Sequence, residues 1–396
     1  MRARMTHWLG NLLLLAAALS ATVILLEHVV FRFLLVPDDL IGNVTINSVV
    51  RYQPGTSATF RHPDGSSSRI TINADGWNST KPVYPRERTP GRLRIAVIGD
   101  SYVHGAFIDV EQGFPEVMER VLARASIDAE VFRFGMDGAP LSQYLHVLRR
   151  EVVAFKPDIV VVPLIHNDFD ESYRELRTRT ASSFLKLTTG ANGGVVEILP
   201  SDFKPGTADA LRRYRTFRYL YYKTNLYLHM KSWTSRLFWG GDEEWSEEHI
   251  SSAVDIRKIN DHAKNRTFAR YVLAEMKALA AREGIRLAFA MDGVREAIYE
   301  GRDPQHYEVG RLNRIAREVT AELDLAFLDL QATFAEDYAR RRERLEFTFD
   351  WHWNVHANRL VGEAIAGLLL DDPRLLGRLP RPIKGATLPQ TAIRPN

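Results

Sequence analysis

Hydrophobic residues alternate between short runs and helical spacings over most of the chain. From Arg94 onward, runs such as RIAVIGD have the length and β-branched content of buried strands. The strands predicted in this way are 94–100, 129–135, 158–165, 285–291 and 325–330. Apolar residues at helical spacing fill the intervals, over 114–125, 141–155, 267–283, 306–323 and 357–370. Strands separated by helices of this length are typical of βαβ units, so the pattern predicts an α/β domain with a parallel sheet covered on both faces.

An uncharged apolar stretch, WLGNLLLLAAALSATVILL at 8–26, lies near the N-terminus. As a helix it is long enough to cross a hydrocarbon core of ~30 Å. Arg2 and Arg4 precede it, and positive residues favour the cytoplasmic side. A cleaved signal peptide is the alternative, because AAALSA offers small residues, but the apolar run exceeds a typical signal-peptide core. We expect 1–35 to be a cytoplasmic N-terminus and uncleaved signal anchor, and the rest to be extracytoplasmic, or periplasmic in a Gram-negative bacterium.

Changes of composition divide the remainder of the chain. Residues 36–92 are polar with short alternating runs and predict an extended lead-in packed on the main domain at 93–372. An insertion at 171–257 breaks the strand–helix rhythm and holds an aromatic and basic cluster at 212–239. This cluster favours an amphipathic helix packed on the domain, and the alternative is a lid or a surface facing a membrane or glycan. Residues 373–396 are rich in Pro and Arg and predict a poorly ordered tail.

Composition excludes several classes of function. The 52 Lys and Arg are spread among 49 Asp and Glu, so no basic patch indicates a nucleic-acid partner. The absence of cysteine removes disulfides, thiolate zinc sites and cysteine nucleophiles. The histidines lack a compact metal-ligand spacing, and GDSYVHG lacks the Gly-x-Gly-x-x-Gly of nicotinamide sites. We therefore expect neither a metal nor a cofactor.

A serine follows the first predicted strand directly. Ser101 would lie at the carboxyl edge of the sheet, where ligands bind and helix N-termini present N–H groups. A hydroxyl at that edge can attack a carbonyl if a base takes its proton. The same position is equally explained by Asp100 or Ser101 capping a helix.

Three further stretches add polar groups after predicted strands. Gly138 can donate its backbone N–H without a side chain in the way, although a turn glycine would look the same. The amide of Asn167 can be a second donor to an oxyanion, or it can form an Asx-turn. Asp350 and His352 lie two residues apart, and in an extended segment they point to the same side. The carboxylate can then hold the imidazole while its other nitrogen faces Ser101.

Together these blocks resemble the SGNH hydrolase superfamily, also called GDSL-type esterases. The residues that carry the resemblance, in order across 94–370, are Gly99, Asp100, Ser101, Gly138, Asn167, Asp350 and His352. The resemblance implies a flavodoxin-like three-layer α/β/α fold with a parallel central sheet. It implies that Ser101 is the nucleophile, His352 the base and Asp350 its orienting partner. The implied oxyanion hole consists of the Ser101 N–H, the Gly138 N–H and the Asn167 side chain.

The chain departs from the usual pattern of that superfamily at several positions. His166 stands where a glycine usually precedes Asn-Asp, and Phe349 stands where the acid usually lies three residues before the histidine. The block DWHW instead resembles the branch of polysaccharide O-acetyltransferases that includes the alginate-modifying enzymes, although Ala357 and Asn358 differ from its Gly-His. The stretch at 71–82 resembles a lead-in seen in anchored members.

These features predict a membrane-anchored, extracytoplasmic serine esterase that removes acyl groups, with acetyl expected, from a carbohydrate or glycolipid. The reaction would pass through an acyl-Ser101 intermediate. The expected partners are an acylated carbohydrate or lipid-linked substrate, and the membrane through the N-terminal helix. One alternative is an O-acetyltransferase that modifies an exported polysaccharide. A second is a non-catalytic glycan-binding scaffold.

Overall fold

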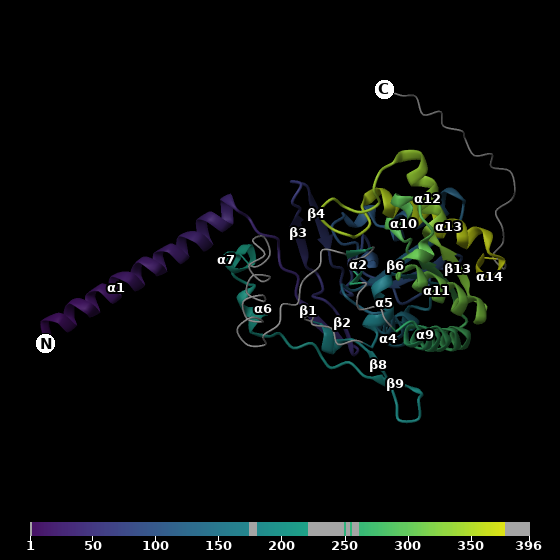
Figure 1. Cartoon of the computed structure of the whole chain (residues 1–396), viewed down its shortest axis with the longest axis horizontal. Coiled ribbons are helices and arrows are strands. Elements are labelled where there is room, and N and C mark those ends of the chain that lie inside the picture. Colours follow the sequence, from purple (N-terminus) through teal and green to yellow (C-terminus); the bar gives the residue numbers. More distant parts are fainter. Residues whose placement is uncertain (1, 174–179, 221–248, 251–253, 256–260, 377–396) are drawn as a thin grey trace, which may run out of the picture.

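The centre of the molecule is a parallel sheet of five strands (Figure 1). The computed structural model describes residues 2–173, 180–220, 249–250, 254–255 and 261–376. The sheet strands are β5 (Leu93–Gly99), β6 (Ala129–Gly135), β7 (Ile159–Leu164), β12 (Arg286–Met291) and β13 (Ala326–Asp329). Their order, β13-β12-β7-β5-β6, is that of the flavodoxin-like fold. The predicted parallel sheet is therefore confirmed, with each strand within two residues of its expected bounds.

Side chains alternate between the two faces of the sheet, and both faces are buried. In β5, Ile95 and Val97 join one core cluster, whereas Ala96 and Ile98 join the other. The helices whose side chains complete the Ala96 cluster are α4 (Leu141–Arg150), α9 (His262–Glu283) and α11 (Gly310–Glu322). Those of the Ile95 cluster are α3 (Phe114–Arg124), α12 (Leu330–Arg341) and α13 (Val355–Asp371). Helices on both faces make the expected three-layer α/β/α arrangement.

Several elements differ from the expected pattern. The helix expected over 141–155 ends at Arg150, because Glu151 leaves the helical conformation and a 3₁₀ turn follows. Within the main domain and outside the insertion, the helices that were not expected include α2 (Ser101–His104), α5 (His166–Glu171), α10 (Arg295–Glu300) and the longer α12. The start of the expected tail is ordered, since Pro373–Leu376 forms the short helix α14 with Leu375 buried. The rest of the tail lies outside the described residues.

The lead-in folds as two hairpins against the main domain. They are β1 (Asn43–Ile46) with β2 (Val49–Tyr52), and β3 (Ser57–Arg61) with β4 (Ser67–Thr71). Arg51 fastens the first hairpin, because its guanidinium donates to both carboxylate oxygens of Glu151 at 3.0 and 2.8 Å. The same guanidinium lies 5.0 Å from the ring centroid of Trp77. All three side chains are buried, so the lead-in shares the core of the domain.

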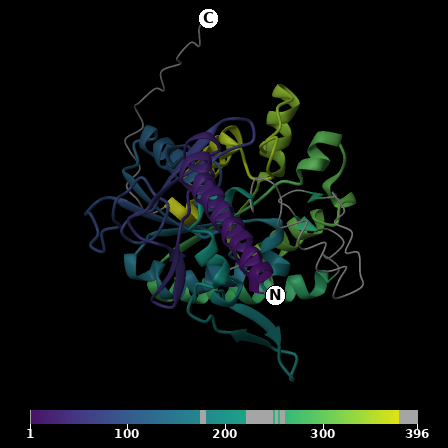
Figure 2. The same cartoon turned by 90° about the vertical axis from the view of Figure 1, so that its left-hand side faces the viewer.

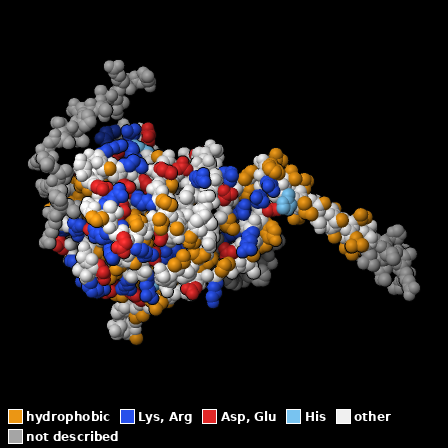
Figure 3. Space-filling view, turned by 180° about the vertical axis from the view of Figure 1, so that it is seen from behind, with side chains coloured by type: hydrophobic (Ala, Val, Ile, Leu, Met, Phe, Trp, Pro, Cys, Tyr) orange, Lys and Arg blue, Asp and Glu red, His pale blue; other side chains and the backbone are white. Residues whose placement is uncertain are grey.

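A long helix projects from the domain (Figures 1 and 2). Helix α1 (Arg2–Leu25) continues as a π-helical segment, Leu26–Leu34. Over Gly10–Leu34 the mean hydropathy is 2.2, and hydrophobic side chains cover its exposed surface (Figure 3). The length and composition suit a membrane span, and a signal sequence near the N-terminus has the same character.

The insertion is described only in part. Its described elements are β8 (Lys186–Thr189), β9 (Val195–Ile198), α6 (Thr207–Leu211), α7 (Arg215–Arg218) and the two-residue strands β10 (His249–Ile250) and β11 (Val254–Asp255). Most of the aromatic and basic cluster at 212–239 lies outside the described residues, so its interpretation as a lid or as packing stays a prediction. The part that is described, α7, packs against the π-helical segment Leu26–Leu34.

Candidate active site

Two glycines allow helix α2 to cross closely over the ends of β5 and β6. A Cβ on Gly99 would lie 2.4 Å from Val103 Cγ2, and one on Gly135 would lie 2.2 Å from the backbone nitrogen of His104. Only glycine fits such an approach of one backbone to another. The helix therefore begins at the carboxyl end of β5, beside β7, where the strand order reverses and ligands bind in this kind of fold. Ser101 is its first residue.

His352 lies between Ser101 and Asp350. Its Nε2 is 2.6 Å from Ser101 Oγ, and its Nδ1 makes a short hydrogen bond with Asp350 Oδ1. The same carboxylate oxygen accepts the backbone N–H of His352 at 2.8 Å. The His352 and Asp350 side chains are 24% and 25% exposed, so they lie at an accessible surface of the domain. Acid, imidazole and hydroxyl form one continuous relay, as a serine nucleophile requires.

Carboxylates surround the imidazole and favour its charged form. Burial alone would lower the pKa of His352, but the hydrogen bond and charge of Asp350 and the charges of Asp100 and Asp137 outweigh it and raise that pKa. The same charges stabilise the imidazolium that forms when His352 takes a proton from Ser101. His352 is thus a stronger base than an ordinary histidine.

A buried arginine fixes the loop that carries His352. Arg295, in α10, donates to the carbonyl oxygen of Trp351 at 2.5 Å and to the Tyr102 hydroxyl at 3.1 Å. Tyr102 donates to the same carbonyl at 3.1 Å. Asp292 accepts from Arg295 at 3.3 Å and from Trp353 Nε1 at 3.0 Å. Because Tyr102 follows Ser101, this network sets the position of the His352 loop relative to the serine.

Sequence reasoning missed Asp292 and Arg295, although one signal was present. Asp292 follows the last residue of β12, and Arg295 begins α10 three residues later, at the same edge of the sheet as Ser101. Polar residues after a buried strand are also the feature by which the other candidate residues were found. The contacts of Asp292 and Arg295 with residues more than fifty positions away could not be inferred from spacing.

Asp100, rather than Ser101, caps helix α2. The Asp100 carboxylate accepts the N–H of Tyr102 at 2.9 Å. Burial raises the pKa of Asp100. The Ser101 hydroxyl is therefore not needed as a cap, and it is bonded to His352 instead.

Gly138 lies in the loop after β6, and the space where a side chain would stand is open. Its φ of +69° is a left-handed conformation, and an added Cβ would meet nothing within 4 Å. Among the hydrogen bonds of the described residues, none uses the Gly138 N–H as donor. This donor is consequently available to a ligand.

Asn167 is the second residue of α5, the helix after β7, and its side chain is hydrogen-bonded to Glu171. Asn167 Nδ2 donates to Glu171 Oε2 at 3.1 Å, and burial raises the pKa of Glu171 to about 7. Within the described part of the chain, no hydrogen bond links Asn167 to Ser101. The amide nitrogen carries a second hydrogen, so it can still donate to a ligand. The neighbouring His166 has no positive φ, which explains why the glycine usual at this place is not required.

An aromatic wall lies beside His352, on the side of Phe107. The Phe107 ring is 5.6 Å from that of His352, and its φ of +65° is rare for a bulky residue. Phe347 and Phe349 stack at 5.1 Å, and the Phe349 ring is 5.1 Å from that of His62 in the β3–β4 hairpin. Phe349, three residues before His352, is therefore part of this half-buried wall, and the lead-in contributes to it.

The other histidines near the site have different partners. His356 Nε2 is 2.6 Å from Asp337 Oδ2, and His104 Nε2 is 3.9 Å from Asp137 Oδ1. Neither has a described hydrogen bond to Ser101. Of the residues that the structure describes, no three His, Asp or Glu are grouped as a metal site would require.

Comparison with known proteins gives distant likenesses only. No family model matches the chain, and no curated protein matches it significantly. A lipase/acylhydrolase from Enterococcus faecalis is 14% identical, with 73% of this chain and 98% of that chain covered and a TM-score of 0.39. An acetylxylan esterase from Geobacillus stearothermophilus, a catalytic mutant, is 14% identical, with 70% and 93% covered and a TM-score of 0.37.

A member of the lipolytic G-D-S-L family from Veillonella parvula DSM 2008 is 12% identical, with 71% of this chain and 100% of that chain covered and a TM-score of 0.36. Likenesses at such low identities and TM-scores assign neither an activity nor a substrate to this chain. Its function has to be inferred from the residues of the site.

Proposed function

We propose that the protein is a membrane-anchored serine esterase of the SGNH type that removes acyl groups, with acetyl expected, from a carbohydrate or glycolipid. The observation that carries the proposal is the continuous relay from Asp350 through His352 to Ser101, at distances that permit proton transfer. It is supported by the position of the relay at the carboxyl edge of a parallel sheet, the edge at which Gly138 and Asn167 also follow strands.

In this mechanism Ser101 Oγ bonds to the ester carbonyl carbon while His352 Nε2 takes the hydroxyl proton. Asp350 stabilises the imidazolium. The carbonyl oxygen becomes an oxyanion and accepts hydrogen bonds from the Ser101 and Gly138 N–H groups and the Asn167 amide. His352 then returns the proton to the leaving sugar oxygen as its bond to carbon breaks. Water attacks the acyl-Ser101 intermediate in the same way, and the free acid and Ser101 are released.

Transfer to a second sugar hydroxyl is the alternative outcome of the same intermediate. The observation that favours it is the aromatic wall of Phe107, Phe347 and Phe349, which limits the access of water on one side of His352. The DWHW block also resembles the O-acetyltransferase branch. A purely glycan-binding scaffold is disfavoured, because binding alone does not require a nucleophile, a base and an acid that are hydrogen-bonded in series.

The proposed location is the outer side of the membrane, with the protein anchored by a single span. It is supported by the exposed apolar surface of Gly10–Leu34 and by the two arginines that precede it, Arg2 and Arg4.

The test uses the full chain in detergent. It should release 4-nitrophenol from 4-nitrophenyl acetate, and it should convert an acetylated oligosaccharide chiefly to free acetate. If the parent chain shows no initial burst of 4-nitrophenol and turns over no faster than the Ser101→Ala variant, the proposed esterase activity is contradicted. Acetate that appears chiefly on an added, deacetylated glycan would replace hydrolysis by transfer.

A further inference from the structure

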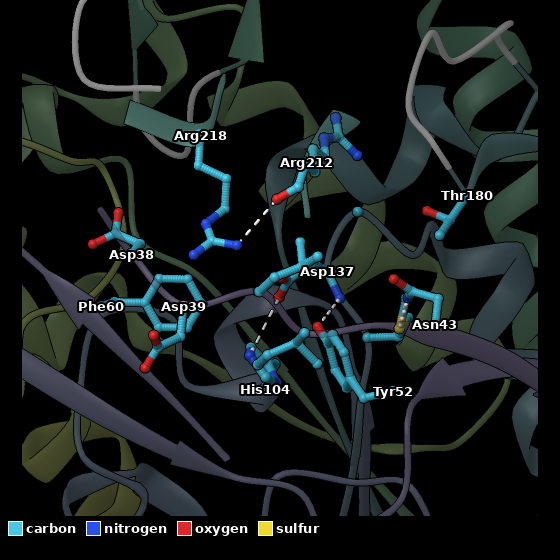
Figure 4. A pocket seen from close by; sticks show the side chains of 14 residues that line it. Asp38, Asp39, Asn43, Tyr52, Phe60, His104, Asp137, Thr180, Arg212 and Arg218 are labelled. Atoms are coloured by element: carbon cyan, nitrogen blue, oxygen red, sulfur yellow. Dashed lines mark hydrogen bonds and ion pairs between the residues drawn. The ribbon is translucent and has the colours of Figure 1, made fainter. Parts of the chain in front are cut away.

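A cavity of about 400 Å³ is lined in part by His104 of α2 and by Asp137 of the loop after β6 (Figure 4). This volume is within the range of sites for small molecules, roughly 300–1,000 Å³. Its walls come from segments distant in sequence: the lead-in at 38–43, hairpin residues Tyr52 and Phe60, the loop 136–138, and α6–α7 of the insertion. The lead-in and the insertion lie outside the strands and helices of the flavodoxin-like core, so this cavity is built by the parts of the chain that the core does not need.

Two residues of the cavity wall connect it with the relay. They are Gly138, whose N–H has no described acceptor, and His104, at the end of the helix that begins with Ser101. Asp137, whose Oδ1 lies 3.9 Å from His104 Nε2, raises the pKa of His352 by its charge, which places it within electrostatic reach of the base. A group that fills the cavity would therefore lie next to an ester carbonyl held at Ser101.

Two residues of the wall each hold a buried nitrogen without a hydrogen-bond partner among the described residues. They are His104, which is 2% exposed and whose Nδ1 is unpaired, and Arg218, whose Nε is unpaired. Figure 4 shows Arg218 extending from α7 towards the side on which His104 and Tyr52 lie. Buried polar groups are almost always paired in folded proteins, so unpaired nitrogens in two cavity residues mark this wall as a place where polar partners are short.

The rest of the lining defines the chemistry of the ligand. Phe60 and Tyr52 offer apolar ring faces, whereas Asp39, Asp137 and Arg218 offer charged acceptors and donors. An acyl chain would remove these charges from water without replacing their hydrogen bonds, at a cost of several kcal/mol per ion. A sugar ring has apolar C–H faces and hydroxyls that both donate and accept.

We propose that this cavity binds the sugar ring that carries the ester, a role that rests on the function proposed above. Hydroxyls of the ring form hydrogen bonds with the charged groups of Asp39, Asp137 and Arg218, and one ring face packs on Phe60. The sugar is thereby held on the Gly138 side of Ser101.

Helix α7, whose Arg218 lines the cavity, is hydrogen-bonded to the N-terminal apolar segment. Glu27, in the π-helical segment, accepts the backbone N–H groups of Arg215 and Thr216 at 2.8 and 2.9 Å, and the rings of Phe31 and Tyr219 are 4.8 Å apart. Helix α7, which carries Arg218, is thus tied to the end of the hydrophobic helix. The sugar site lies at the membrane-proximal end of the domain, within reach of a glycan attached at the membrane surface.

The test compares two substrates in the full chain in detergent. The ratio of kcat/KM for the 6-O-acetyl methyl glycosides of glucose, galactose and mannose to kcat/KM for 4-nitrophenyl acetate measures recognition of the sugar. We expect Arg218→Gln and Phe60→Ala to lower this ratio tenfold or more for the best glycoside. The matched control is Arg213→Gln, an exposed arginine five residues earlier that does not line the cavity, and it should leave the ratio within twofold. Unfolding temperatures of all variants identify any that fail to fold.

An unchanged ratio in both folded cavity variants would overturn the proposal. So would a loss confined to longer 4-nitrophenyl esters, such as the octanoate, because it would assign the cavity to the acyl chain. Binding of the same glycosides to the inactive Ser101→Ala chain, followed by saturation-transfer NMR, separates the site from catalysis. Binding that Phe60→Ala abolishes supports the cavity even if the esterase proposal fails, and binding that persists in Ser101→Ala/Phe60→Ala contradicts it.

Discussion

One carboxylate oxygen of Asp350 accepts two hydrogen bonds from His352, one from the ring Nδ1–H and one from the backbone N–H. The two-residue spacing makes this possible, since a single oxygen can reach the backbone and the ring of the same residue. With the ring proton on Nδ1, the Nε2 atom is unprotonated and lies 2.6 Å from Ser101 Oγ. A local sequence feature thus fixes the tautomer of a base whose target lies 251 residues earlier.

The first prediction concerns the pH profile. His352 acts as a base only when neutral, so kcat/KM should fall as the pH drops through its pKa, and the raised pKa places this midpoint above the ordinary value of about 6.5. Asp350→Asn removes the hydrogen bond and charge that raise the pKa. The midpoint should therefore move to lower pH, and the plateau should fall by about 10³–10⁴-fold because the tautomer is no longer fixed.

The pH dependence of 4-nitrophenyl acetate hydrolysis measures both changes. Asp64→Asn, an exposed carboxylate in the β3–β4 turn, is the matched control and should reproduce the parent profile. A midpoint that does not move in Asp350→Asn would show that another group limits the reaction.

The second prediction distinguishes the histidines of the DWHWNVH segment. His352→Ala should lower kcat by about 10³-fold or more, because no other described side chain is bonded to Ser101 Oγ. His356→Ala should retain activity within about threefold, since His356 is bonded to Asp337. Steady-state kinetics of the two variants is sufficient. A collapse of equal size in His356→Ala would move the base to that residue.

The third prediction concerns Arg295 as a positioning residue. Arg295→Lys keeps the charge beside Asp292 but cannot hold the Trp351 carbonyl and the Tyr102 hydroxyl together. A shift of the His352 loop by a fraction of an ångström should lower kcat by about 10–100-fold with little change in KM. Arg302→Lys, at a side chain that is 68% exposed, is the control.

A merely structural role for Arg295 would give a different result. It would lower the unfolding temperature and leave kcat of the folded fraction close to that of the parent. Equal kcat for Arg295→Lys and Arg302→Lys at a temperature where both are folded would exclude the positioning role.

The fourth prediction uses the absence of cysteine from the chain. A Ser67→Cys variant in β4 should react with a membrane-impermeant maleimide in intact spheroplasts, because the domain is proposed to lie outside the membrane. A Thr6→Cys variant, ahead of the apolar helix, should react only after lysis. The reverse pattern of labelling would invert the topology.

Much of the core could be predicted from the sequence. Strands such as β5 and β7 are buried on both faces, so they appear as continuous apolar runs that no other structure explains as well. The relay was also predictable, because Asp350 and His352 are local to one another and Ser101 follows a buried strand. Helix α12 was missed because its sequence, LQATFAEDYARR, buries only three residues and carries no clear apolar stripe.

The rest of the site depends on contacts that no local pattern encodes. Arg295 is recognisable only through Trp351 and Tyr102, which lie 56 and 193 residues away. Phe107 reaches His352 through a left-handed backbone that bulky residues rarely adopt. The cavity joins the lead-in to the insertion, two segments whose composition indicated loops and turns rather than a binding surface.

The central claim is that Ser101 is an activated nucleophile, and active-site labelling tests it most directly. The full chain in detergent, treated with a fluorophosphonate probe, should gain the mass of one adduct, because a base-activated hydroxyl beside oxyanion donors attacks such reagents. Peptide mapping should place the adduct on Ser101, and the Ser66→Ala control should label as the parent does. We predict no adduct on Ser101→Ala, and labelling of that variant to the extent of the parent would contradict the claim.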